Sequence, residues 1–414
     1  MAAVSRIRER ARSTFWVVPA VCVVAAVGLA IGLVALDRAI GDREITYLFP
    51  GPPEGARSFL GAIISAMISF TALIFSITIV VLVLTSGQFS PRVLRRFLRD
   101  RAIQWSLGIF VATFVYAMTV VRAVLGTNNT GAFVPRIAVT AAFLLVLLSV
   151  GLFIYYIHHI AHMIRAASII TSIGEGTRAL LERRCPVDAP PPPEPVTPQP
   201  DIVVPATRPG VVVSVNEVAI VARAAQEDRT IVLVPRVGDF VAEGAPLFQV
   251  SGGDPDRDWL HREVVLADER TMEQDVAFGF RQLVDIAERA LSPSTNDPTT
   301  ACQAIDVLHD LLRRLATRRL PTGRLSDGDG RVRLVVPQYD FADYLQVALV
   351  EIWFYGSDSA QVPERLATLL RDLQSVALPE HRPVVQLWAA VIEPVVARRR
   401  AGYPDLPGAA AMAE

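Results

Sequence analysis

Residues Ser58 to Arg101 decide the fold of this chain, and they read SFLGAIISAMISFTALIFSITIVVLVLTSGQFSPRVLRRFLRDR. The apolar part of this stretch is about 28 residues long, which exceeds the ~20 that a helix needs to cross the hydrocarbon core of a bilayer. Arginines crowd the end of the stretch, and basic loops stay on the cytoplasmic side of a membrane. The stretch therefore predicts a transmembrane helix with a cytoplasmic C-terminal end.

This predicted helix carries two different polar faces. With a 100° step per residue, one stripe contains small residues at spacings of three and four, which allow close approach of another helix. Threonines recur every seven residues on roughly the opposite face. The hydroxyls either line a water-filled path or pack while bonding back to the carbonyl of residue i−4, and both alternatives remain open. The stripe consists of Gly61, Ser65, Ser69, Ala72 and Ser76, and the threonines are Thr71, Thr78 and Thr85.

The basic segment after the helix follows a break at Pro91. Apolar residues alternate with its arginines, which is typical of a short helix at the anionic surface of the inner leaflet. The same arginines also suit a role in membrane insertion alone. The candidate contacts to anionic lipid are Arg92, Arg95, Arg96, Arg99 and Arg101.

Three further apolar runs are long enough to span a bilayer, at about Phe15–Leu36, Ala102–Leu125 and Ile137–Ile164. The N-terminus and the Arg92–Arg101 loop are both densely basic, so we expect both to be cytoplasmic. Four spans then return the chain to the cytoplasm. The sequence thus predicts a multi-pass protein of the bacterial inner membrane, with its N-terminus and C-terminal region in the cytoplasm.

The composition excludes several classes of chemistry. All 40 basic residues are arginine, so Schiff-base, biotinyl and P-loop lysines are ruled out. The three cysteines have no metal-ligand spacing, and the net charge of −1 does not indicate a nucleic-acid partner. His158 and His162 stand four residues apart on one face, but interfacial histidines beside tyrosines explain them without a metal. We expect no cofactor.

The C-terminal region has an α+β pattern. Valine-rich alternation from Val203 to Val250, interrupted by Gly238-Asp239 and Glu243-Gly244, predicts short strands that form a small β-barrel. Helical periodicity dominates from Leu260 onward and predicts a helical bundle. The expected organisation is a cytoplasmic N-terminus (1–14), a four-helix transmembrane domain (15–165), a cytoplasmic helix extension (166–184), a proline-rich linker (185–202), a small β-rich domain (203–255), a helical domain (256–400) and a disordered tail (401–414).

The densest polar cluster of this region is the sequence SPSTNDPTT, residues 292–300. Asp297 followed by Pro298 is typical of a helix N-cap with proline at the first helical position. Helix N-termini also accept anions, so a polar or anionic ligand is the functional alternative to capping. The candidate ligand residues are Ser292, Ser294, Asn296, Asp297 and Thr299.

Two separated motifs carry a family resemblance. The first is QFSPR, residues 88–92, and the second is the run QLVDIAERALSPSTNDPTTA, which ends at Ala301. Together they resemble a family of predicted bacterial membrane proteins catalogued as domain of unknown function 2254. The resemblance covers about residues 10 to 400, and the proline-rich linker lies outside its pattern. It implies a membrane architecture and supplies no activity.

These observations favour a homo-oligomeric, channel-like protein whose second spans surround a polar path. The spans carry no acidic residue in their core, so a passive path is expected rather than a proton- or cation-driven transporter. The alternative is a membrane-anchored sensor or scaffold that binds a ligand or partner through its cytoplasmic region. An enzyme is the least favoured class, because no catalytic motif is visible. The expected partners are the lipid bilayer and further copies of the chain, and the sequence identifies no ion or small-molecule ligand.

Overall fold

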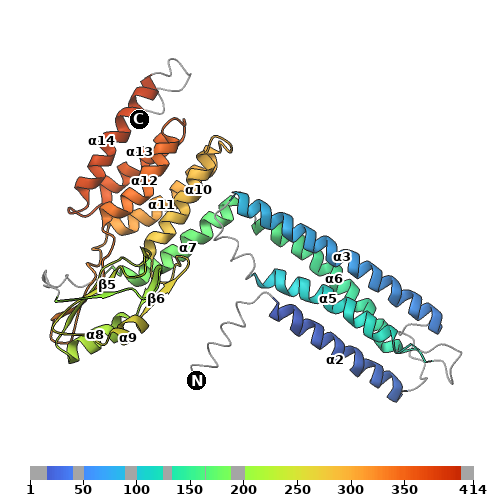
Figure 1. The fold of residues 1–414 in the computed structure, drawn as a ribbon. Helices are drawn as coiled ribbons and strands as arrows, with labels where there is room; N and C mark the ends of the chain where they lie inside the picture. Colours follow the sequence, from blue (N-terminus) through green and yellow to red (C-terminus); the bar gives the residue numbers. More distant parts are fainter. Residues whose placement is uncertain are drawn as a thin grey trace. The chain divides into compact units, whose positions relative to one another are not determined.

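The computed structural model describes residues 16–40, 51–88, 100–124, 133–163, 165–187 and 201–401. The chain divides into two compact units, which Figure 1 draws along the sequence from blue to red. The N-terminal unit is Met1–Arg165, and the C-terminal unit is Ala166–Glu414.

The N-terminal unit contains four long helices within the described residues, which confirms the four predicted spans. All four are long and apolar enough to cross a membrane. The second one continues to Gln88, shortly before the predicted break at Pro91. The helices are α2 (Val17–Ile40), α3 (Pro53–Gln88), α5 (Arg101–Val121) and α6 (Arg136–Met163).

Helix α5 is the most buried of the four, and it packs against each of the other three. Gly108 allows α2 to lie close, because a Cβ at this position would stand 2.9 Å from the sulfur of Cys22. On another side, the buried hydroxyls of Thr113 and Ser149 lie 3.1 Å apart and join α5 to α6. Small and polar residues thus hold the helices together where apolar packing alone gives little specificity in lipid.

The helix ends of this unit are tied together by side chains from other helices. The buried carboxylate of Asp37, near the end of α2, accepts hydrogen bonds from the first backbone N–H groups of α6, at Ile137 and Ala138, both 3.0 Å long. Arg57 of α3 donates to the carbonyl of Val124, just after α5, at 2.7 Å. The first two bonds satisfy N–H groups that the start of α6 leaves without a partner, and the third satisfies a carbonyl just beyond the end of α5.

The C-terminal unit contains a helical part. Helix α7 packs against α10 and α11, and α10 in turn packs against α12. Glycines permit the closest approaches of α7: a Cβ on Gly279 would stand 2.0 Å from the Thr177 hydroxyl oxygen, and one on Gly174 would stand 2.5 Å from a methyl group of Val307. The helices are α7 (Ala166–Arg184), α10 (Val276–Leu291), α11 (Pro298–Ala316), α12 (Phe341–Gly356), α13 (Val362–Val376) and α14 (Arg382–Ala401).

The strands of this unit form two sheets, a larger mixed one and a smaller antiparallel one. The larger has the order β1-β5-β3-β8-β7 and the smaller β4-β2-β6, and the one parallel pair in the described residues is β3 with β8. Both orders have free ends, so no closed barrel is present in the described part of the chain, and the predicted β-barrel is not supported. The strands are β1 (Ile202–Pro205), β2 (Gly210–Val215), β3 (Thr230–Leu233), β4 (Phe240–Val241), β5 (Pro246–Ser251), β6 (Val264–Ala267), β7 (Arg324–Ser326) and β8 (Val332–Val335).

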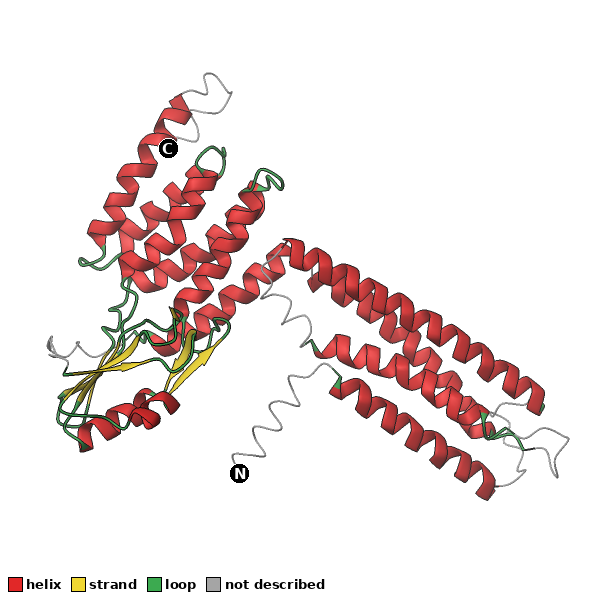
Figure 2. Ribbon diagram, in the orientation of Figure 1, coloured by secondary structure: helices red, strands yellow, loops and turns green. Residues whose placement is uncertain are grey.

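One element of the β region differs from the predicted run of strands. The segment Glu217–Gln226 is helix α8, because Asn216 caps its N-terminus and Ile220 and Ala224 are buried one turn apart. A second short helix, α9 (Arg257–Arg262), buries Leu260 in the same apolar core as the two sheets. Figure 2 shows both short helices together at the edge of the strands, away from the long helices of this unit.

The glycine contact between α7 and α10 generates a stability prediction. Replacing Gly279 with alanine places a methyl group against the fully buried Thr177, which we expect to lower the free energy of unfolding by about 1–3 kcal/mol. Gly328→Ala is the matched control, because nothing lies within 4 Å of a Cβ at that position. Thermal unfolding of the purified protein in detergent measures both variants. Equal midpoints for the two would contradict the close packing of α7 on α10.

Candidate functional site

The small-residue stripe of α3 lies on the surface of the N-terminal unit. Ser65, Ser69, Ala72 and Ser76 are all exposed. The buried residues of the helix lie on the opposite side, at Ile63, Met67 and Ile74. Gly61, at the start of the stripe, has no neighbour within 4 Å of where its Cβ would stand. Among the described residues, no other helix of the unit therefore covers Ser65, Ser69, Ala72 and Ser76.

The threonine face of α3 lies beside the core of the unit. The hydroxyl of Thr78 donates to the Ile74 carbonyl at 2.7 Å and lies 2.5 Å from the hydroxyl of Tyr156 on α6. Thr71 bonds back to the Met67 carbonyl at 2.7 Å. The side chain of Thr85 lies outside the described residues. The two described threonines thus find their hydrogen-bond partners within one subunit.

Four of the candidate lipid-contacting arginines lie outside the described residues, namely Arg92, Arg95, Arg96 and Arg99. Arg101 is the first residue of α5. The sequence did not single out its neighbour Asp100, which caps α5 by accepting from the N–H of Ala102 at 2.8 Å. The other oxygen of Asp100 lies 3.1 Å from Nε2 of His159, so this carboxylate also joins α5 to α6.

The polar loop between α10 and α11 is a capping structure. Asp297 accepts from the backbone N–H of Thr300 at 3.0 Å and from its hydroxyl at 2.5 Å, with proline next in the chain, as the sequence predicted. These bonds from Thr300 hold the pKa of Asp297 below its usual range. Asn296 has a positive φ of 46°, and the Ser292 hydroxyl lies 3.2 Å from that of Ser294. Ser294 and Thr299 are exposed. Many of the loop's polar groups are thus hydrogen-bonded to other groups of the same loop.

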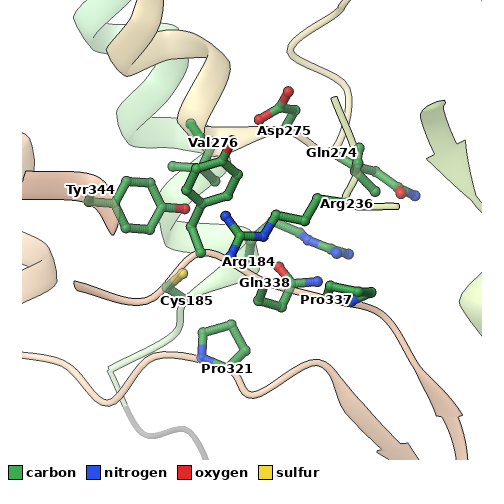
Figure 3. Close-up of a pocket in the computed structure, with 13 residues that line it drawn as sticks. Arg184, Cys185, Arg236, Gln274, Asp275, Val276, Pro321, Pro337, Gln338 and Tyr344 are labelled. Carbon is green, nitrogen blue, oxygen red and sulfur yellow. The ribbon is translucent and has the colours of Figure 1, made fainter. Parts of the chain in front are cut away.

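The C-terminal unit contains a polar pocket that the sequence did not reveal (Figure 3). Its walls come from five segments: the end of α7, the segment that follows β3, the start of α10, the segment between α11 and β7, and the segment that follows β8 and continues into α12. The side chains meet from positions up to 160 residues apart. The lining residues are Arg184, Cys185, Arg236, Val237, Gln274, Asp275, Val276, Ala277, Pro321, Pro337, Gln338, Tyr339 and Tyr344.

The charged groups of the pocket are held in fixed positions by their neighbours. Arg184 donates to both carboxylate oxygens of Glu217, at 3.1 and 2.7 Å. Arg236 stacks on the ring of Tyr339, 4.6 Å from its centroid, and lies 3.1 Å from Asp343. Side chains held by stacking and ion pairs lose little further freedom when a ligand binds.

Two further groups of the pocket, the carboxylate of Asp275 and the thiol of Cys185, belong to buried residues. Asp275 caps α10 and accepts two hydrogen bonds from Arg270, yet burial still raises its pKa. Burial also raises the pKa of the Cys185 thiol to about 11, so this sulfur is protonated at neutral pH and is a poor nucleophile. Within the described residues, no group of three or more His, Cys, Asp or Glu side chains is arranged to hold a metal ion.

The comparison with known protein families is decisive for the identity of the chain. A family model described as "Predicted membrane protein (DUF2254)" matches residues 12–372. The chain belongs to this family. It is also 34% identical to uncharacterised proteins of Mycobacterium bovis and Mycobacterium tuberculosis over 423 aligned positions, which cover 96% of this chain and 80% of each relative. No solved structure matches the chain significantly.

Membership of the DUF2254 family agrees with the resemblance carried by the two sequence motifs. The second motif runs through α10 and the loop to α11, so part of it consists of the buried face of α10 and the Asp297 cap. The first motif begins at Gln88, the last residue of α3, and its other residues lie outside the described part of the chain.

The Asp297 cap generates a second stability prediction, with a defined pH dependence. Asp297→Ala removes the acceptor for the first turn of α11, and we expect a loss of about 1 kcal/mol in the free energy of unfolding at pH 7. Because the folded-state pKa of Asp297 is lowered, its stabilisation is present above the unfolded-state pKa of about 4 and is lost as the pH falls through the folded value. The deficit of the alanine variant should therefore shrink below about pH 4.

Thermal unfolding of wild type, Asp297→Ala and Asp297→Asn at several pH values makes this measurement. Asparagine keeps an oxygen acceptor without the charge, so Asp297→Asn should lie between the other two at pH 7. A deficit of the alanine variant that stays constant into the acid range would contradict the role of the carboxylate charge.

Proposed function

We propose that this protein is a homo-oligomeric, channel-like membrane protein in which copies of α3 meet along a shared axis. The proposal rests above all on one observation, the exposure of the stripe Ser65, Ser69, Ala72 and Ser76 on the face of α3 opposite to the subunit core. In this arrangement, the serines of several copies surround a polar passage. The C-terminal units then regulate or stabilise the assembly.

The contrast with another exposed face of the same unit supports this proposal. Helix α6 exposes large apolar residues, including Leu144, Leu147 and Ile154, as expected for contact with lipid. Helix α3 also exposes large apolar residues, such as Leu73 and Phe75, but it carries small hydroxyl and methyl groups along the centre of its exposed face. Small residues at these spacings favour close approach of a second helix, and hydroxyls add interhelical hydrogen bonds or contact water.

The chemistry of the stripe favours a passive path. The Ser69 hydroxyl already bonds back to the Ser65 carbonyl at 3.1 Å, so the stripe presents uncharged polar groups whose hydrogen-bonding needs are partly met. No acidic residue lies in α3 after Glu54. Proton-coupled and cation-coupled transporters depend on intramembrane ionisable groups, which this stripe does not supply.

The proposal includes a topology. The basic N-terminus and the basic segment between α3 and α5 belong on the cytoplasmic side of the bacterial inner membrane. With four spans, the C-terminal unit then also lies in the cytoplasm. Cysteine labelling of intact cells tests this: a cysteine at the exposed Val218 should react only after the cells are permeabilised.

A second candidate function is a membrane-anchored sensor. The observation that favours it is the polar pocket of the C-terminal unit, whose wall includes the end of α7, the first helix after the N-terminal unit. A ligand in this pocket would stabilise one position of that helix end.

Disulfide cross-linking tests the assembly. With Cys302→Ser as background, Ser69→Cys should form a covalent dimer under mild oxidation in native-like lipid, because copies of α3 face one another. Leu147→Cys on α6 is the matched control, being exposed toward the proposed lipid face. Electrophoresis without reducing agent separates the outcomes. Equal cross-linking at both positions, or none at Ser69→Cys, would rule out assembly through this stripe.

Conductance tests the passage itself. Purified protein in planar bilayers should carry current, and a charged thiol reagent should reduce the current of Ser69→Cys at least by about half while leaving Leu147→Cys unaffected. An oligomer that carries no current would support assembly through α3 but would rule out the channel function.

A further inference from the structure

We propose that the polar pocket of the C-terminal unit is a binding site for a small oxyanion group, a carboxylate or a phosphate. This inference is independent of the channel-like function, because every residue that carries it belongs to the C-terminal unit. The hydrogen-bonding groups that line the pocket, the hydroxyl of Tyr344 and the size of the cavity all point to this ligand class (Figure 3).

The lining of the pocket contains two guanidinium groups and one carboxylate. Arg184 and Arg236 both line it, and each guanidinium has more N–H groups than its bonded carboxylate uses. The one carboxylate in the lining, Asp275, already accepts from Arg270 and from the backbone of Phe278. The side-chain amide of Gln274 accepts from the N–H of Val215 and donates to its carbonyl. A ligand that supplies acceptor oxygens is therefore the complement of this lining.

The hydroxyl of Tyr344 points to the same conclusion. Tyr344 is 6% exposed, and Figure 3 shows its oxygen directed from α12 into the group of lining side chains. Among the described residues, no hydrogen-bond partner is found for this oxygen, although the ring packs against Phe280 and Tyr339. Burial raises the pKa of Tyr344, so the hydroxyl keeps its proton and acts as a donor. A ligand oxygen bound in the pocket would give this hydroxyl an acceptor, which the described residues do not supply.

The size of the cavity limits the ligand. Its volume of about 20 Å³ is somewhat larger than the roughly 10–15 Å³ that one water molecule needs on the same measure. The cavity therefore admits one or two oxygen atoms of a carboxylate or phosphate group, and the rest of the ligand would have to remain outside. Planar guanidinium groups are also suited to bind such groups with two parallel hydrogen bonds.

Two substitutions test the proposal in the full-length protein in detergent micelles. Tyr344→Phe removes only the hydroxyl, and Arg236→Gln removes one guanidinium. Isothermal titration calorimetry with inorganic phosphate, and separately with acetate, should show one site per chain in the wild type. Each substitution should weaken binding of the preferred anion about tenfold, the usual effect of losing a hydrogen bond to a charged group. The preferred anion shows whether the site takes phosphate or carboxylate.

The chain offers a matched control for each variant. Arg223 stacks on Trp259 and is ion-paired with Asp256, as Arg236 is with Tyr339 and Asp343, but it lies outside the pocket. Tyr355 is an exposed tyrosine on the same helix as Tyr344. Arg223→Gln and Tyr355→Phe should therefore bind as the wild type does.

Circular dichroism and gel filtration establish that each variant is folded, and if one fails to fold the other decides. The proposal is overturned if neither anion binds the wild type at concentrations up to about 10 mM. It is equally overturned if the folded Tyr344→Phe or Arg236→Gln variant binds as tightly as its control.

Discussion

The N-terminal unit depends on how its helix ends satisfy their backbone groups. A helix leaves its first N–H groups and its last carbonyls without intrahelical partners, and a low-dielectric surrounding makes such groups costly. Here the carboxylate of Asp37 accepts from the first N–H groups of α6, and Arg57 donates to a carbonyl in the segment after α5. Asp100 accepts from the first turn of α5 and also pairs with His159. Each of the three side chains joins parts of the unit that lie 59 or more residues apart in sequence. The bonds that complete each helix therefore also fix which helices are neighbours.

The spans could be predicted because length and hydropathy are properties of single segments. The β region was harder, because valine and isoleucine suit both a buried strand and the apolar side of a short helix. Residues 217–226 form α8, and Asn216 caps its N-terminus. In the sequence, the alternation of valines favoured a strand more strongly than this single capping residue favoured a helix. The hairpin β7–β8 was missed as well. Its strands are short, and β8 gains its place by pairing with β3, about a hundred residues earlier.

The candidate site was predictable only in part. Helical spacing was sufficient to place the serines and threonines of α3 on different faces, but only packing shows which face is outward. The Asp297 cap followed from two adjacent residues. The pocket around Tyr344 could not be found in this way, because its walls are assembled from five separate segments and no local pattern marks any of them.

The parallel pairing of β3 with β8 has a consequence for how the C-terminal unit forms during synthesis. Strand β8 is made only after α10 and α11, so the larger sheet stays without two of its five strands until residue 335 has left the ribosome. Until then the edge of β3 offers unpaired backbone groups that other strands are able to join. Long-range pairing of this kind slows folding and prolongs that exposure. The nascent chain thus passes through a stage in which its membrane helices are complete while its sheet is still open to neighbouring chains.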